Sequence, residues 1–77
     1  MYDPFTEAEQ AILTEEGFEP SGFPNQWMRV IRPSGEDVGD VFFVCKMGDT
    51  FYGSHRYPIG SDDHYEDTDL IALLDKV

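Results

Sequence analysis

A hairpin pattern in the middle of the chain places the strongest limit on how this sequence can fold. Residues 41–47 form a run of aromatic and β-branched residues, which is typical of a strand. Gly48 and Asp49 follow this run as a two-residue turn signal, and residues 50–57 return as a second strand. We therefore predict an antiparallel hairpin with its tip at these two residues.

The predicted register sorts the side chains of this hairpin onto two faces, because successive side chains of a strand alternate. One face carries Phe42, Val44, Lys46, Phe51, Gly53 and His55. The other carries Phe43, Cys45, Met47, Tyr52 and Ser54. Both sets contain apolar residues, so we expect a helix to cover one face and the second face to offer a partly apolar surface.

A helix over residues 6–16 precedes the hairpin. Thr6 and Glu9 have the spacing of a capping box, in which each side chain accepts a hydrogen bond from the backbone of the other residue. Gly17 is suited to end the helix in a left-handed conformation, which brings Phe18 against Leu13.

The remaining segments complete a small α+β domain. Residues 26–32 are predicted as a strand, 33–40 as a turn, 58–67 as an acidic loop and 68–76 as a second helix. The expected fold is a single domain over residues 1–77, in which a three-stranded antiparallel sheet lies between two helices in the order α-β-β-β-α.

The charge of the chain limits its partners. The sequence has 16 acidic and 5 basic residues, so the formal net charge is −11. Phosphates are bound by lysine and arginine, so direct nucleic-acid binding is not expected, nor is attachment to an anionic membrane. No apolar run is long enough to cross a bilayer.

The single cysteine excludes an intrachain disulfide. Cys45 stands between apolar residues, which favours a buried thiol that behaves as a small hydrophobic side chain. Lack of disulfides fits a reducing cytoplasm, which would be the host cytoplasm for a phage-encoded protein. A core this small predicts either a monomer or a small homo-oligomer.

Signals for catalysis and metal binding are weak. Residues 62–69 place five carboxylates around His64, but they lack the central glycine and final glutamate of a calcium-binding EF-hand loop. The sequence has no phosphate-binding loop and no nucleophile motif. We therefore expect no enzyme activity, no cofactor and no metal site, and we keep as an alternative a metal-binding or catalytic domain centred on His55 and His64.

The expected order of elements resembles the double-stranded-RNA-binding fold and the small HicA-type ribonuclease toxins. Those toxins carry a Gly-Ser-His motif shortly after the first helix, whereas Gly53, Ser54 and His55 lie on the third predicted strand. The resemblance concerns topology alone and implies no catalytic residue here.

Acidity is then the main functional signal. Carboxylates on a small folded body can imitate nucleic-acid phosphates and attract a basic protein surface. We therefore predict an inhibitor that binds a basic, nucleic-acid-binding protein, similar in size and charge to anti-CRISPR proteins and other phage-encoded nucleic-acid mimics. A regulatory or adaptor subunit with a hydrophobic interface is the alternative. The predicted partner-binding residues are Glu15, Glu16, Glu19, Trp27, Asp62, Asp63, Glu66 and Asp67.

Overall fold

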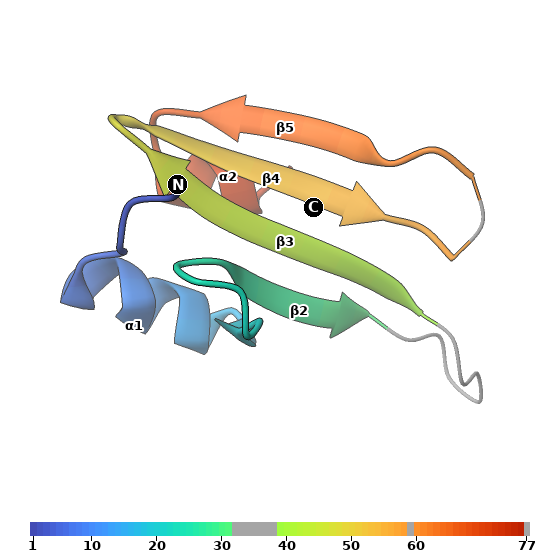
Figure 1. Ribbon diagram of the computed structural model, residues 1–77, viewed down its shortest axis with the longest axis horizontal. Coiled ribbons are helices and arrows are strands. Elements are labelled where there is room, and N and C mark those ends of the chain that lie inside the picture. Colours follow the sequence, from blue (N-terminus) through green and yellow to red (C-terminus); the bar gives the residue numbers. More distant parts are fainter. Residues whose placement is uncertain (32–38, 59, 77) are drawn as a thin grey trace.

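The computed structural model describes residues 1–31, 39–58 and 60–76, which form two helices and five strands. The elements follow in the order α1 (Glu7–Glu15), β1 (Glu19–Pro20), β2 (Trp27–Ile31), β3 (Asp40–Met47), β4 (Thr50–Arg56), β5 (Asp63–Asp67) and α2 (Leu70–Leu74). Each strand pairs antiparallel with its neighbours in sequence, in the order β1-β2-β3-β4-β5 (Figure 1). Most of the predicted turn at 33–40 lies outside the described residues.

The α+β class is confirmed, but the prediction of three strands was wrong because the sheet has a further strand at each edge. β5 occupies part of the predicted acidic loop, where only Tyr65 offers an apolar side chain toward the core. Its pairing with β4 holds this polar segment in a strand. β1 has two residues and contains Pro20. Proline has no backbone N–H to donate to a neighbouring strand, so it is tolerated at the edge of a sheet. The topological resemblance to a helix–three strands–helix fold therefore does not hold.

The central hairpin forms in the predicted register. Met47 pairs with Thr50 across the turn, and Phe42 pairs with His55. Gly48 has a φ angle of 61°, a left-handed conformation that glycine adopts without steric cost. The hairpin therefore follows from its own turn and alternation, as the sequence predicts.

Both predicted ends of the first helix are also confirmed. The Thr6 hydroxyl accepts a hydrogen bond from the Glu9 backbone at 3.2 Å, and the Glu9 carboxylate accepts one from the Thr6 backbone at 2.8 Å. At the other end, the Phe18 backbone donates to the Leu13 carbonyl at 2.8 Å around Gly17, whose φ is 88°. This closure places Phe18 and Leu13 together in the core.

One hydrophobic cluster joins the two helices to the same face of the sheet. Phe42 and Val44 of β3 are fully buried between Leu13 of α1 and Leu73 of α2. In Figure 1, α1 lies beside β2 and α2 lies behind β3 and β4, both toward the end where β3 turns into β4. The full cluster consists of Phe5, Leu13, Phe18, Phe42, Val44, Phe51, Leu70 and Leu73.

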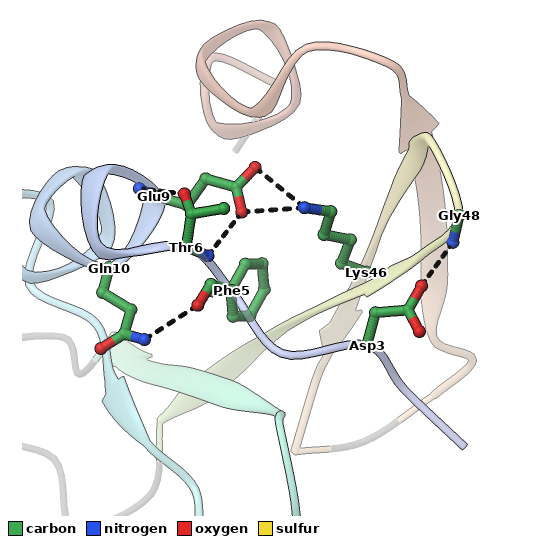
Figure 2. Close-up of polar contacts among 7 residues, drawn as sticks. All are labelled: Asp3, Phe5, Thr6, Glu9, Gln10, Lys46 and Gly48. Carbon is green, nitrogen blue, oxygen red and sulfur yellow. Dashed lines mark hydrogen bonds and ion pairs between the residues drawn. The ribbon is translucent and has the colours of Figure 1, made fainter.

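The first five residues, which precede the first predicted helix, are part of this structure. Phe5 is buried and stacks on Phe51 with ring centroids 6.3 Å apart. The Asp3 backbone donates to the Lys46 carbonyl at 2.8 Å. The Asp3 carboxylate accepts from the Gly48 backbone at 2.7 Å (Figure 2). The N-terminal segment thus lies along β3 beyond the start of β2.

The capping glutamate of α1 also joins the helix to the sheet. The Lys46 ammonium contacts the two Glu9 carboxylate oxygens at 3.0 and 3.3 Å, and both side chains are about four-fifths removed from solvent (Figure 2). Burial by itself would raise the pKa of Glu9. The hydrogen bond from the Thr6 backbone and the ion pair with Lys46 outweigh burial and lower that pKa.

A Glu9→Gln substitution is expected to reduce the free energy of unfolding at neutral pH by about 1–2 kcal/mol. Glutamine keeps an oxygen for the Thr6 backbone but loses the ion pair with Lys46. A carboxylate with a lowered pKa stabilises the fold above its ordinary pKa, and this contribution disappears as the pH falls through the lowered value. Urea unfolding should therefore show a difference between the two proteins at neutral pH that shrinks as the pH falls below the ordinary pKa of a glutamate side chain.

Glu7→Gln is the matched control, since Glu7 lies in the same first turn and its side chain contacts no described polar group. Its expected effect is below about 0.5 kcal/mol. Equal losses in the two variants would show that the helix dipole, rather than the contact with Lys46, accounts for the role of Glu9.

Candidate functional site

The predicted acidic residues lie at two opposite edges of the sheet. Glu19 belongs to β1 at one edge, and Glu15 and Glu16 end the adjoining helix α1. The second group, residues 62–67, includes β5 at the other edge. Four strand spacings separate β1 from β5, which corresponds to about 19 Å. The two groups therefore flank the sheet instead of forming one cluster.

Three carboxylates near β5 have partners within the chain. Asp62 contacts Arg56 at 3.6 Å, and Asp63 accepts a hydrogen bond from the Tyr57 hydroxyl at 2.6 Å. Asp67 accepts from the Asp69 backbone at 2.9 Å, directly before α2. These three side chains help to hold β5 and the start of α2 in place.

Two pKa shifts reflect these contacts. The hydrogen bond from the Asp69 backbone, aided by Lys76, lowers the pKa of Asp67. The hydrogen bond to Asp63 raises the pKa of Tyr57 to about 12, because the carboxylate favours the protonated hydroxyl. At neutral pH Asp67 is therefore ionised and Tyr57 is neutral.

Four other predicted carboxylates point into solvent. They make no side-chain hydrogen bond or ion pair with any residue that the structure describes, and all four are exposed. They are Glu15, Glu16, Glu19 and Glu66. Their charge is therefore accessible to a partner at both edges of the sheet.

The basic side chains that the structure describes already have partners. Lys46 contacts Glu9, Arg56 contacts Asp62 and Lys76 contacts Asp67 at 3.3 Å. Arg29 donates to the Glu16 carbonyl and lies over the Phe18 ring, 4.8 Å from its centroid. Negative charge consequently dominates the polar surface.

Trp27 is held within the fold. It lies at the start of β2 on the face that α1 covers, and its ring meets Phe5 edge to face with centroids 6.4 Å apart. Trp27 is half-buried and packs against the hydrophobic cluster. Its structural role in the core is therefore clear.

The second face of the sheet carries apolar side chains that no described helix covers. We call it the open face, and it is turned toward the viewer in Figure 1. Cross-strand pairing places Met28 beside Phe43, Val30 beside Val41 and Cys45 beside Tyr52 on this face. We call this set its apolar centre: Met28, Val30, Val41, Phe43, Cys45 and Tyr52.

Every member of the apolar centre remains at least partly accessible. Val30 retains 40% of its accessible surface, and the other five residues are half-buried. The prediction that Cys45 is buried was wrong in this respect, because odd-numbered residues of β3 point away from the helices. Partial burial still raises the pKa of the Cys45 thiol, although its contact with Tyr2 has the opposite effect. The alternation of the hairpin predicted part of this face, but the predicted set did not include Met28, Val30 or Val41.

The two histidines lie on opposite faces of the sheet. His55 contacts Asp40 at 3.0 Å on the helical side and stacks on Tyr57 with ring centroids 4.2 Å apart. Phe42, its partner in the β3–β4 register, lies next to it with ring centroids 6.1 Å apart. His64 instead pairs with Ser54 at 3.3 Å on the open face.

This arrangement does not bring together the histidine-centred site considered from the sequence. Within the described residues, no group of three or more histidine, cysteine, aspartate or glutamate side chains is placed to hold a metal ion. Among the same residues, no helix is long and apolar enough to cross a membrane.

Comparison with known proteins gives no relative from which a role could be transferred. No family model matches this chain, and no curated protein or solved structure is significantly similar to it. The acidic edges and the open face are therefore the features of this protein that point to a function.

Proposed function

We propose that this protein is a non-catalytic binding protein that occupies a basic surface of a partner protein. The observation that supports the proposal is the uneven use of charge. The described basic side chains contact groups within the chain, whereas Glu15, Glu16, Glu19 and Glu66 project their carboxylates into solvent. Such a surface attracts lysine and arginine side chains and repels phosphates.

The partner that fits this charge best is a nucleic-acid-binding protein. Its binding groove must be basic to hold phosphates, so an acidic body of this size can enter it and exclude the nucleic acid. We propose inhibition of this kind, as carried out by anti-CRISPR proteins and other nucleic-acid mimics of phages and mobile elements. A reducing cytoplasm, which the single cysteine favours, is the proposed location.

The test is affinity capture by the immobilised protein from a lysate, followed by salt-dependent binding measurements with each stoichiometric partner after its purification. We expect the dissociation constant to rise by about tenfold or more between about 50 and 300 mM salt, because screening weakens charge attraction. We also expect the protein to displace nucleic acid from the partner. A partner whose affinity does not depend on salt would contradict the proposal.

Charge neutralisation provides the matched comparison. Replacing Glu15, Glu16 and Glu66 by glutamine should weaken binding more than replacing three other exposed carboxylates by the corresponding amides. The control residues are Glu7, Asp49 and Asp75, which also make no side-chain contact with described polar groups. Equal weakening by the two sets would show that overall charge, rather than the predicted residues, determines affinity.

A further inference from the structure

The sheet register places charged and apolar side chains in continuous rows across the open face. Residues that pair directly in neighbouring strands share one face of a sheet. Following the pairs from β1 to β5 gives a row of Glu19, Met28, Phe43, Ser54 and His64. A second row, from β3 to β5, consists of Cys45, Tyr52 and Glu66.

The first row begins at a carboxylate on the β1 edge, and the second row ends at a carboxylate on the β5 edge. Glu19 on β1 and Glu66 on β5 are exposed and make no side-chain contact with described polar groups. We call these two residues the acidic rim. On the same face, Arg56 lies between Asp62 and the Phe43 ring, 5.5 Å from the ring centroid. The open face thus has an apolar centre bordered by negative charge.

This combination is typical of an interface. Large contiguous apolar patches are rare on monomeric proteins, and the largest apolar patch of a protein surface is often a site of interaction. Interfaces commonly combine an apolar centre with a polar rim. Phe43 and Tyr52 supply the aromatic side chains that often anchor such contacts.

The negative charge of the acidic rim favours a basic partner at the open face over a second copy of this chain. A second copy of this chain would bring another molecule of net charge −11 and another pair of rim carboxylates against the first, which disfavours self-association. A basic partner has the complementary charge.

The width of the face then favours a helix. An α-helix with its side chains is about 10–12 Å across, whereas the edge strands are about 19 Å apart. One helix therefore covers the apolar centre and leaves room for long basic side chains to reach both edges.

We propose that the open face binds a basic amphipathic helix of a partner protein. The apolar stripe of that helix contacts the apolar centre, and the lysine or arginine residues that flank the stripe reach Glu19 and Glu66. This inference rests on the proposed function, because it names the surface that meets the basic partner and the chemistry of the partner segment.

The test is an NMR titration of the whole ¹⁵N-labelled chain with a synthetic peptide of about 18 leucine and lysine residues. Its leucines follow helical spacing, so that they form one apolar stripe flanked by lysines. We expect the largest amide shifts on β2, β3 and β4, with binding that weakens by about tenfold between about 50 and 300 mM salt. Shifts concentrated on α1 and α2 would overturn the proposal.

Two control peptides separate the contributions of pattern and charge. A peptide of the same composition but scrambled order has no apolar stripe, and a leucine–glutamate peptide keeps the stripe with the opposite charge. We expect both to bind at least about tenfold more weakly than the leucine–lysine peptide. Equal binding of the scrambled peptide would overturn the proposed helical recognition.

Variants of the apolar centre test the surface directly. Replacing Val30 and Val41 by threonine keeps the β-branched shape and adds a hydroxyl to each of two paired residues. We expect this double variant to weaken peptide binding by about tenfold. Ile71→Thr is the matched control, because Ile71 is 54% exposed on α2, away from the open face. A twofold or smaller effect of the double variant would overturn the proposal.

The same double variant separates this inference from the proposed function when it is tested on the captured partner. Salt-dependent binding that is insensitive to the two threonines would retain the proposed function and overturn the open face as its surface. Sensitivity to the threonines without salt dependence would retain the open face as a docking surface and contradict the charge-based function. Dimers of this chain with interface shifts on the open face would assign it to a second copy and overturn the proposal.

Discussion

Phe42→Ala is expected to lower the free energy of unfolding by about 3–5 kcal/mol, which is most of the stability available to a domain of this size. The Phe42 ring is fully buried and meets Phe18 edge to face with centroids 5.8 Å apart. It also stacks near Tyr65 at 6.2 Å and approaches the Cα of Gly53 from the neighbouring strand. Removing the ring leaves a cavity between the sheet and the helices that these elements cannot close without moving.

Phe43→Ala is the matched control, because it makes the same chemical change at the next residue and on the opposite face. Phe43 is half-buried on the open face, where its ring lies beneath Arg56. We expect a loss of about 1 kcal/mol there. Circular dichroism with urea unfolding measures both variants, and a comparable loss at the two positions would contradict the assignment of the core to one face.

Gly53→Val is expected to destabilise the protein by about 2–3 kcal/mol by overfilling the same region. A Cβ atom at this position would lie 3.0 Å from Phe42 Cζ and 3.5 Å from Leu73 Cδ1. Carbon atoms in contact normally lie about 3.5–4.0 Å apart, so the Phe42 ring would have to move. Valine adds two further methyl groups between β4 and α2.

The neighbouring substitution Ser54→Val serves as the comparison for Gly53→Val. Ser54 points to the open face, where its hydroxyl meets His64 at 3.3 Å in an exposed position. Valine favours strands, so the expected change in the free energy of unfolding is within about 0.5 kcal/mol. If thermal or urea unfolding showed Gly53→Val to be as mild as Ser54→Val, the close approach of sheet and helix at Gly53 would not limit stability.

The parts of the fold that were predicted correctly depend on local chemistry. The β3–β4 register follows from a two-residue turn, and the ends of α1 follow from Thr6, Glu9 and Gly17. Each of these signals acts within a few residues of chain. They therefore appear in the sequence as recognisable patterns without knowledge of distant contacts.

The edge strand β5 and the buried position of Phe5 depend on contacts between distant residues. The sequence did not predict them. β5 has four polar residues around Tyr65, and its strand conformation comes from pairing with β4. Phe5 precedes a helix and has no periodic pattern around it, yet it is buried against Phe51. A single aromatic side chain in a polar segment is a weak signal for either arrangement.

The candidate site was predicted in its residue types more than in its geometry. The sequence indicated acidic residues as the binding groups. It could not show that Asp63 and Asp67 have internal partners, whereas the Glu19 and Glu66 side chains contact no polar group that the structure describes. It also could not place Met28 and Val30 beside the hairpin, since that requires the pairing of β2 with β3. The acidic rim and the apolar centre become one surface only through this long-range register.

The nearest-neighbour order of the strands has a consequence for the speed of folding. Strands that pair with their neighbours in sequence need shorter loop closures than strands that pair with distant segments, which favours faster folding. The β3–β4 hairpin closes over two residues and is the natural place for folding to begin. The contact between Asp3 and Gly48 spans 45 residues, so the N-terminal segment is expected to join the sheet late, after the surface that it borders has formed.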